Sequence, residues 1–323
     1  MTGRAARAHR GGSDSVRLTT RLASFSLAAL ASISACADVL DIAENPVLVP
    51  PDSFTCKDDA NSPSPMPDNA VVRVRACDFI SSNCSTPARG LTAKLCDKKD
   101  FPCEKPRIAE LKDVDGELMF EVPTGGTLGS GFDGYLAVLG PLEQCGDKMN
   151  VAGLDACQLA PKCDMAKRMA QDKDCLIPTY IPALLFFNPP ITADTSPPIV
   201  LPLIPSIAGQ NLLAGAAGGA TVDPSQGIVF VTGLDCFGHP SAGMTFTSSP
   251  AAGRVIYIES GLVNPTAVAT DRSGVAGLLG LPMGFAWVSA FTPGQMGARE
   301  VAKTGIQIMP ATVSYVALAP TAN

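Results

Sequence analysis

Short runs of alternating apolar and polar residues recur along this chain, and glycine, proline or aspartate separates them. In the first half the runs cover residues 71–75, 91–95, 117–122 and 134–139. Alternation with a period of two is typical of β-strands with one buried face. Several short strands with turn residues between them favour a β-sandwich over a βαβ fold. The pattern therefore predicts an all-β protein.

The order of these signals repeats in the second half of the chain. The segments VVRVRACD, ARGLT, DVDGELMFEVPTG and FDGYLAVLGP correspond to IVFVTGLDC, SAGMT, DRSGVAGLLGLPMG and FAWVSAFTP. Aspartate precedes glycine at matching places, in Asp113 and Gly116 and again in Asp271 and Gly274, and the strand that follows ends in Pro-x-Gly. The later segments IPALLFFNPP and PIVLPLIP correspond to GIQIMP and TVSYVALAP. Such a repeat predicts a duplicated domain.

This succession of motifs resembles the carboxypeptidase regulatory-like domain, a transthyretin-like β-sandwich. The resemblance covers residues 66–204 and 223–320, and it is clearer in the second unit. It implies two tandem sandwiches without catalytic residues or cofactors, which serve as accessory, adhesive or carbohydrate-associated modules. The first unit departs from the family pattern by an insert at 141–177 that is rich in cysteine and partly helical, with helix formers at 166–171.

The N-terminus has the features of an export signal. An uncharged apolar stretch at 22–33 follows a basic region, and it is too short to span a bilayer core, which needs about 20 residues. The basic region contains Arg4, Arg7, Arg10, Arg17 and Arg21. These features predict a signal peptide at 1–35.

The signal ends in Ile33-Ser34-Ala35-Cys36, which resembles the lipobox of bacterial lipoproteins. The resemblance implies that Cys36 receives the lipid and becomes the mature N-terminus. Ala37 follows in place of a retaining aspartate, which implies sorting to the outer membrane, on its periplasmic or cell-surface face. The alternative is an ordinary secretory signal with a coincidental cysteine.

Ten cysteines remain after Cys36, and an even number in an exported chain predicts five disulfides. A metal site would need CxxC pairs or several histidines, but the mature chain has neither, with His239 its only histidine. Local pairs such as 77–84, 96–103 and 163–175 could close, although the connectivity stays open. The ten are Cys56, Cys77, Cys84, Cys96, Cys103, Cys145, Cys157, Cys163, Cys175 and Cys236.

The composition between these features sets the remaining boundaries. Residues 36–65 are rich in proline, serine and aspartate and predict a disordered tether. Residues 205–222 predict a connector between the two sandwiches. The stretch 195–222 has no charged residue, but its prolines and glycines favour a buried strand and a short helix at 206–214 over a membrane span.

Charge and motifs restrict the function. The leader holds five of the 24 basic and one of the 30 acidic residues, so the mature chain has a net charge of −10, which argues against nucleic-acid binding. No GxSxG, HExxH or P-loop pattern occurs. His239 precedes proline in a turn. Asp113-Val114-Asp115-Gly116 resembles the start of a calcium loop, but an Asp-Gly hairpin turn is favoured.

Aromatic residues are the candidates for stacking on a sugar, although aromatic side chains at alternating strand positions are usually core. For Trp287 the repeat favours a packing role, because it corresponds to the region around Tyr135. The candidates are Tyr135, Tyr180, Tyr257, Trp287 and Tyr315.

The sequence as a whole predicts a non-catalytic surface lipoprotein. It would be attached to a membrane through its N-terminal lipid, and it would bind an unidentified protein or polysaccharide or contribute to envelope architecture. Two alternatives stay open. One is a carbohydrate-active hydrolase with two acids about 5 to 9.5 Å apart, and the other is a calcium-dependent adhesin.

Overall fold

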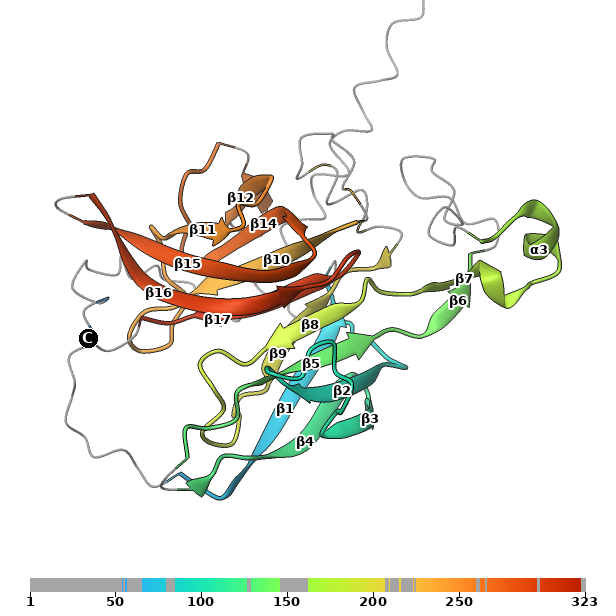
Figure 1. Ribbon diagram of the computed structural model, residues 1–323, viewed down its shortest axis with the longest axis horizontal. Coiled ribbons are helices and arrows are strands. Elements are labelled where there is room, and N and C mark those ends of the chain that lie inside the picture. The colour runs from blue at the N-terminus through green and yellow to red at the C-terminus, as the bar shows by residue number, and fades with distance from the viewer. Residues whose placement is uncertain are drawn as a thin grey trace, which may run out of the picture.

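The computed structural model shows an all-β protein made of two β-sandwiches in tandem, as the sequence predicts (Figure 1). The predicted signal peptide, Cys36 and nearly all of the predicted tether lie outside the described residues. The structure describes residues 54, 56, 66–79, 85–126, 129–145, 162–206, 209, 215, 223, 225–259, 262–264, 266–294 and 297–320.

The first sandwich packs a three-stranded sheet against strands of a larger one. The small sheet has the order β4-β1-β9, with β1 at Asn69–Asp78, β4 at Glu117–Pro123 and β9 at Ile199–Leu203. The facing strands are β2 (Thr92–Asp97), β3 (Ile108–Lys112), β5 (Gly134–Leu139) and β8 (Ala183–Phe186). Alternation along β1 produces this packing, because Val72 and Val74 are buried while Arg73 and Arg75 are exposed.

The second sandwich repeats the arrangement. Its strands in the large sheet are β10 (Gln226–Gly233), β12 (Arg254–Glu259), β13 (Leu262–Asn264), β14 (Val275–Pro282) and β17 (Val313–Leu318). The facing sheet has the order β11-β15-β16, with β11 at Thr245–Ser249, β15 at Gly284–Gly294 and β16 at Gly297–Ile308. The core between them includes Val229, Val231, Leu278, Val288 and Ile306.

Strand pairing confirms that the two sandwiches are repeats. In the first, β1 pairs antiparallel with β4 and parallel with β9, and in the second, β10 pairs in the same ways with β14 and β17. The same corner closes both units: Ala76 N donates to Gly116 O at 2.8 Å, and Gly233 N donates to Gly274 O at 2.8 Å. The motifs matched in the sequence therefore occupy equivalent places in the fold.

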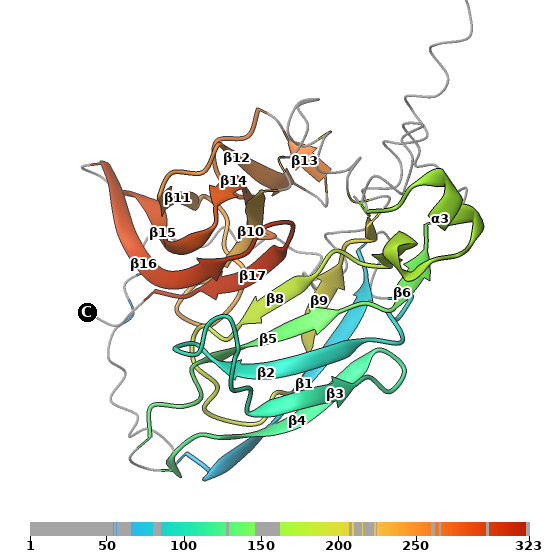
Figure 2. The same ribbon diagram turned by 45° about the vertical axis from the view of Figure 1, so that its right-hand side comes forward.

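One continuous sheet joins the two sandwiches, which the sequence does not predict. Strand β8 of the first unit pairs in parallel with β17 of the second over four residue pairs, from Ala183–Val313 to Phe186–Val316. The resulting sheet has nine strands in the order β13-β12-β14-β10-β17-β8-β5-β2-β3. Figure 2 shows β8 and β17 side by side at the centre of the molecule. The small sheets cover different parts of this large sheet.

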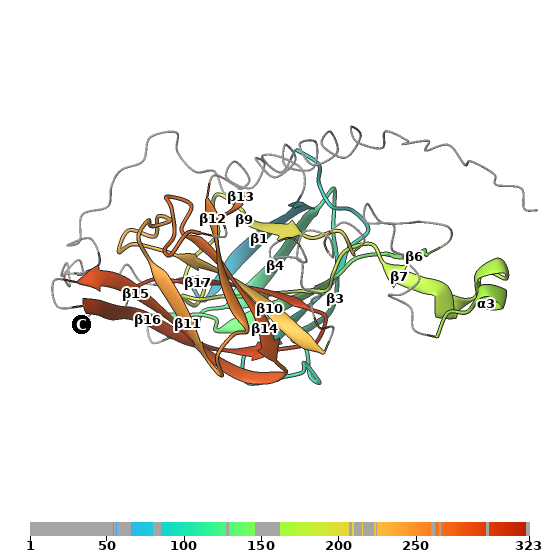
Figure 3. The same cartoon turned by 90° about the horizontal axis from the view of Figure 1, so that it is seen from above.

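The insert of the first sandwich projects away from both cores (Figure 3). It contains β6 (Leu142–Gln144), α3 (Met165–Met169), the 3-10 helix η5 (Lys173–Cys175) and β7 (Leu176–Pro178). The helix begins after Asp164, whose side chain accepts a hydrogen bond from Lys167 N at 2.8 Å. No residue of α3 is buried, so cross-links rather than apolar packing must hold this part of the insert.

Disulfides link the parts of the structure. Cys96 pairs with Cys103 and Cys163 with Cys175, two of the local pairs considered from the sequence. Cys56 pairs with Cys236 across 180 residues and ties the start of the described chain to the second sandwich. Cys77 and Cys145 are disulfide-bonded too, with partners outside the described residues.

The uncharged stretch between the sandwiches begins with a strand, as predicted. Leu201 and Leu203 of β9 are buried, and Ser206 and Gly209 after it are helical. Most of the predicted connector helix at 206–214 lies outside the described residues. No helix in the described part of the chain is long and apolar enough to cross a membrane.

Candidate functional site

A half-open groove of about 530 Å³ lies at the junction of the two sandwiches. The first sandwich contributes the end of β8, the segment that follows it and β9, and the second contributes β10, β12, β14 and β17. The wall is largely apolar and includes Phe79, Phe187, Phe230, Ile258, Val275 and Tyr315. Small-molecule sites are typically concave, mainly apolar, about 300–1,000 Å³ in volume and often placed between domains, so this groove has the form of a binding site.

Aromatic rings from both sandwiches fix the groove wall. The rings of Phe230 and Tyr315 are stacked with centroids 5.7 Å apart, and Phe79 lies 6.2 Å from Phe230. The Tyr315 hydroxyl donates a hydrogen bond to Pro202 O at 2.5 Å, which connects β17 to β9. The groove is therefore largely preformed, because each of these rings contacts another fixed element.

Few polar groups line the groove, and most of them are engaged. Asn188 Nδ2 donates to Ala317 O at 2.6 Å, and Asp194 Oδ1 accepts from Val71 N at 2.7 Å. Ser273 Oγ donates to Ile258 O at 3.2 Å. Among the described residues of the lining, Asp194 is the one charged residue and none is basic. The groove therefore suits an uncharged, mainly apolar group.

The internal repeat shows that this apolar surface is specific to the second sandwich. In the first sandwich, Arg75 on β1 faces Glu117 on β4, and their side chains form an exposed ion pair at 3.9 Å. The equivalent neighbours in the second sandwich are Thr232 on β10 and Val275 on β14. Phe230 likewise occupies the position of Arg73. Phe230 and Val275 are buried in one cluster with Ile204, and Thr232 is half-buried in the groove wall. Uncharged residues therefore replace the charges of the first sandwich where the second sandwich meets it.

The structure divides the candidate sugar-stacking residues. Tyr135 and Tyr257 are buried, and Tyr180 and Tyr315 are half-buried. The predicted packing role of Trp287 is wrong: its side chain is 45% exposed on the outer face of β15. The rings of Trp287 and Phe285 pack edge to face with centroids 5.1 Å apart. Lys303 Nζ lies 5.3 Å from the centroid of the Trp287 ring.

The repeat explains why the two aromatic positions differ. Tyr135 belongs to a buried cluster that contains residues of both sandwiches, and the ring centroid of Phe186 from its own sandwich lies 5.3 Å from that of Tyr135. In the second sandwich, half of the Phe285 side chain is exposed beside Trp287, so the described residues leave the corresponding face open. The sequence could align the positions but could not show which face the neighbouring unit covers.

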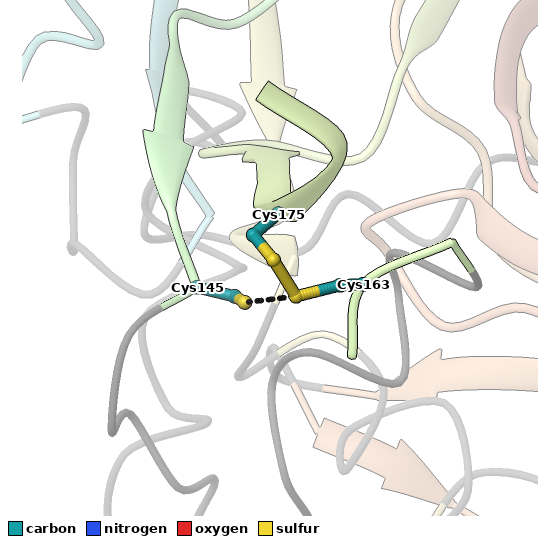
Figure 4. A group of neighbouring side chains, drawn as sticks. All are labelled: Cys145, Cys163 and Cys175. Carbon is teal, nitrogen blue, oxygen red and sulfur yellow. Dashed lines mark hydrogen bonds between the residues drawn. A yellow bond between two sulfur atoms is a disulfide. The ribbon is translucent and has the colours of Figure 1, made fainter. Parts of the chain in front are cut away.

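Three cysteines of the insert lie together, with their sulfur atoms within 4.8 Å of one another (Figure 4). Cys163 is bonded to Cys175, and Cys145 Sγ lies 3.8 Å from Cys163 Sγ. Among the described residues, this is the one group of three or more Cys, His, Asp or Glu side chains with converging ligand atoms. Because the metal ligand is a thiolate and these sulfurs are in disulfides, the cluster is a cross-link in this state.

The Asp-Gly motif considered as a calcium loop is a hairpin turn. Both central residues have positive φ angles, 53° at Asp115 and 81° at Gly116, as a type I′ turn requires. The two oxygens of Asp113 accept hydrogen bonds from Leu91 N at 2.5 Å and Gly116 N at 3.0 Å. The carboxylate therefore serves the backbone of the turn.

His239 lies in a turn, as predicted. The side chain of the buried Asp235 accepts hydrogen bonds from His239 N at 2.9 Å and Phe237 N at 2.8 Å, while 77% of the His239 side chain is exposed. This histidine is not among the residues that line the groove.

Comparison with known proteins gives no family assignment. No protein-family model matches the chain, and no curated protein matches it. Similar solved structures include a streptococcal ancillary pilin, at 11% identity over 78% of this chain and 68% of that one, with a TM-score of 0.21. The shaft pilin spaA of Lactobacillus rhamnosus GG has 13% identity over 80% and 98%, with a TM-score of 0.19. The minor pilin GBS52 of Streptococcus agalactiae has 14% identity over 78% and 96%, also with a TM-score of 0.19.

Similarity this low shows no function shared with these pilins. The structure is therefore that of two disulfide-containing β-sandwiches joined through one sheet, with a preformed apolar groove between them.

Proposed function

We propose that this chain is a non-catalytic lipoprotein of the outer membrane that acts as a binding, adhesion or structural module, with the groove as its binding site. The observation that carries the proposal is the comparison of the two repeats. The ion pair of Arg75 and Glu117 in the first sandwich is replaced in the second sandwich by Thr232 and Val275, which line the preformed groove. A binding surface for an apolar partner requires such an uncharged wall.

Membrane attachment through Cys36 rests on the lipobox-like sequence. The disulfides support an oxidising compartment, because such bonds persist outside the reducing cytosol. Lipid on Cys36 would attach the mature chain to the membrane, and the segment between Cys36 and Cys56 would link that anchor to the second sandwich.

The anchoring is tested by Cys36→Ser in the full-length chain expressed in a bacterial host. The wild-type protein should incorporate labelled palmitate and sediment with membranes, whereas Cys36→Ser should lose the label and the membrane association. The disulfides serve as the control, since both proteins should show the same mobility difference between reduced and oxidised samples. Persistence of the variant in the membrane fraction would mean that another segment attaches the chain.

The geometry favours this proposal over the two alternatives. The described residues of the groove lining include one carboxylate, Asp194, whereas a glycosidase mechanism needs two. Both oxygens of Asp113 are engaged by backbone N–H groups, which disfavours a calcium loop there. Added calcium should therefore leave the melting temperature unchanged, because a ligand that binds only the folded state must raise it.

One observation favours polysaccharide as a partner at a different place. Trp287, Phe285 and Lys303 form an exposed aromatic and cationic surface on the small sheet of the second sandwich. Affinity electrophoresis in gels that contain envelope polysaccharide tests this role. Retardation of the wild type but not of Trp287→Ala would support it, and equal mobility would argue against it.

A further inference from the structure

We propose that the groove binds a single alkyl chain whose head group is uncharged and carries hydroxyls, as in a monoacylglycerol. This inference rests on the proposed binding function of the groove and names the ligand class. It follows from three features of the site: the apolar wall, the absence of basic residues from that wall, and the blocked edge of β9.

The wall fits an alkyl chain because aromatic and aliphatic side chains make up most of it. Phe79, Phe230 and Tyr315 form a row of contacting rings from one sandwich to the other. Ile258 and Val275 continue the apolar surface across β12 and β14. Burial of methylene groups against such a surface is the main source of affinity for an apolar ligand, since each buried CH₂ contributes about 0.8 kcal/mol.

The edge of β9 excludes a peptide that would bind as an added strand. Pro202 has no N–H to donate, and its carbonyl accepts the hydrogen bond from Tyr315 Oη at 2.5 Å. Two residues on, Ile204 O accepts from Ile181 N at 2.8 Å. Strand addition depends on main-chain hydrogen bonds along such an edge, and at Pro202 and Ile204 the protein has used or removed them. A ligand without a backbone therefore fits better.

Charge at the groove determines the head group. Asp194 is the one charged side chain among the described residues of the lining, and none of these residues is basic. A fatty-acid carboxylate would be repelled by Asp194 and would have no cation to pair with. The amide of Asn188, the hydroxyl of Thr232 and the carboxylate of Asp194 can hydrogen-bond to hydroxyl groups. The site thus favours a hydroxyl head over an anionic one.

The experiment uses the full-length chain with Cys36→Ser, so that no lipid of its own competes. Binding of monoacylglycerols of increasing chain length is measured by isothermal titration calorimetry below their aggregation concentrations. The affinity should rise about fourfold for each added methylene until the groove is full. The fatty acid of the same chain length should bind at least about tenfold more weakly at neutral pH.

Thr232→Arg tests the groove by substitution. Arginine is chosen because Arg75 occupies the equivalent position in the first sandwich. It places a long cationic side chain in a groove that would otherwise hold an alkyl chain, and the affinity should fall at least about tenfold. Thr247→Arg, the same substitution at an exposed position of β11, is the matched control and should bind as the parent does. Equal melting temperatures of the two variants would show that the loss is local.

Several outcomes would overturn the inference. An affinity independent of chain length, or equal losses in both arginine variants, would mean that the groove does not hold an alkyl chain. Binding of extended apolar peptides that Thr232→Arg abolishes, without monoacylglycerol binding, would refute the ligand class but keep the groove as a binding site. Neither result would affect membrane attachment through Cys36, which the fractionation experiment tests separately.

Discussion

At the scale of single residues, equivalent positions of the two repeats have opposite environments. Tyr135 and Trp287 both lie on the outer faces of their sandwiches, yet Tyr135 is 1% exposed and Trp287 is 45% exposed. Tyr135 lies in a buried cluster that contains residues of both units, whereas Trp287 lies outside that cluster. Alternation therefore determines on which face of the sheet a side chain lies, while tertiary packing determines whether that face is buried.

Burial of Tyr135 has a consequence for stability at alkaline pH. Burial, and secondarily the nearby Asp100, raises the pKa of Tyr135 to about 12 in the folded protein. The unfolded value is about 10. Because the folded state holds the proton more tightly, stability is intact below about pH 10 and falls as the pH rises towards 12. The loss should be about 1–2 kcal/mol after allowance for partial solvation.

Urea unfolding of the wild type and Tyr135→Phe between about pH 9 and pH 12 measures this effect. The variant loses the hydrogen bond from Tyr135 Oη to Asp100 O, at 3.1 Å, so it should be about 1 kcal/mol less stable at the lower pH. Its further loss towards pH 12 should be smaller, since one ionising group is absent. Parallel curves for the two proteins would contradict the assignment of this pH dependence to Tyr135.

At the scale of elements, alternation and turn residues predicted most of the strands. The four runs of the first half became β1, β2, β4 and β5, and the repeat placed their counterparts in the second half. Strand β3 gave no clear signal, because its pattern is mostly exposed and charged residues lie among its five positions. An edge strand of this kind has little apolar surface from which a pattern could be recognised.

Gly116 precedes β4 and Gly274 precedes β14, and these glycines link sequence most clearly to local structure. An added Cβ at Gly274, where φ is 67°, would lie 2.6 Å from Gly233 O and 2.8 Å from Ser241 N. Gly274→Ala should therefore lower the free energy of unfolding by at least about 3 kcal/mol, from backbone strain and crowding together. Chemical denaturation monitored by circular dichroism measures the change.

Gly243→Ala is the matched control in the same sandwich. Gly243 also has a positive φ, 79°, but no heavy atom lies within 4 Å of the added Cβ. This variant should lose only about 1–2 kcal/mol from the left-handed backbone conformation. Equal losses in the two variants would show that crowding at the corner of the second sandwich contributes nothing.

At the scale of the whole molecule, the sequence predicts two sandwiches but not the way in which they join. Alternation in β8 and β17 marks each as a strand, and no local pattern specifies that one will pair with the other. The groove is equally hidden, because its wall combines Phe79 and Phe187 of one unit with Phe230 and Tyr315 of the other. The replacement of Arg75 by Thr232 between the repeats was a signal in the sequence, but its meaning depends on knowing which side of β10 meets the junction.

The shared sheet implies that the two sandwiches unfold together. Strand β8 pairs with β17, and one buried cluster contains Tyr135 and Phe186 of the first unit with Ile308 of the second. Separation of the units would expose this cluster and break the central strand pair, so a partly folded state with one intact sandwich should be disfavoured. Differential scanning calorimetry should show a single transition for the oxidised protein. Gly116→Ala in the first unit and Gly274→Ala in the second should each lower the temperature of that whole transition. Two transitions, of which each variant moves only one, would show instead that the sandwiches are independent domains that meet at an edge.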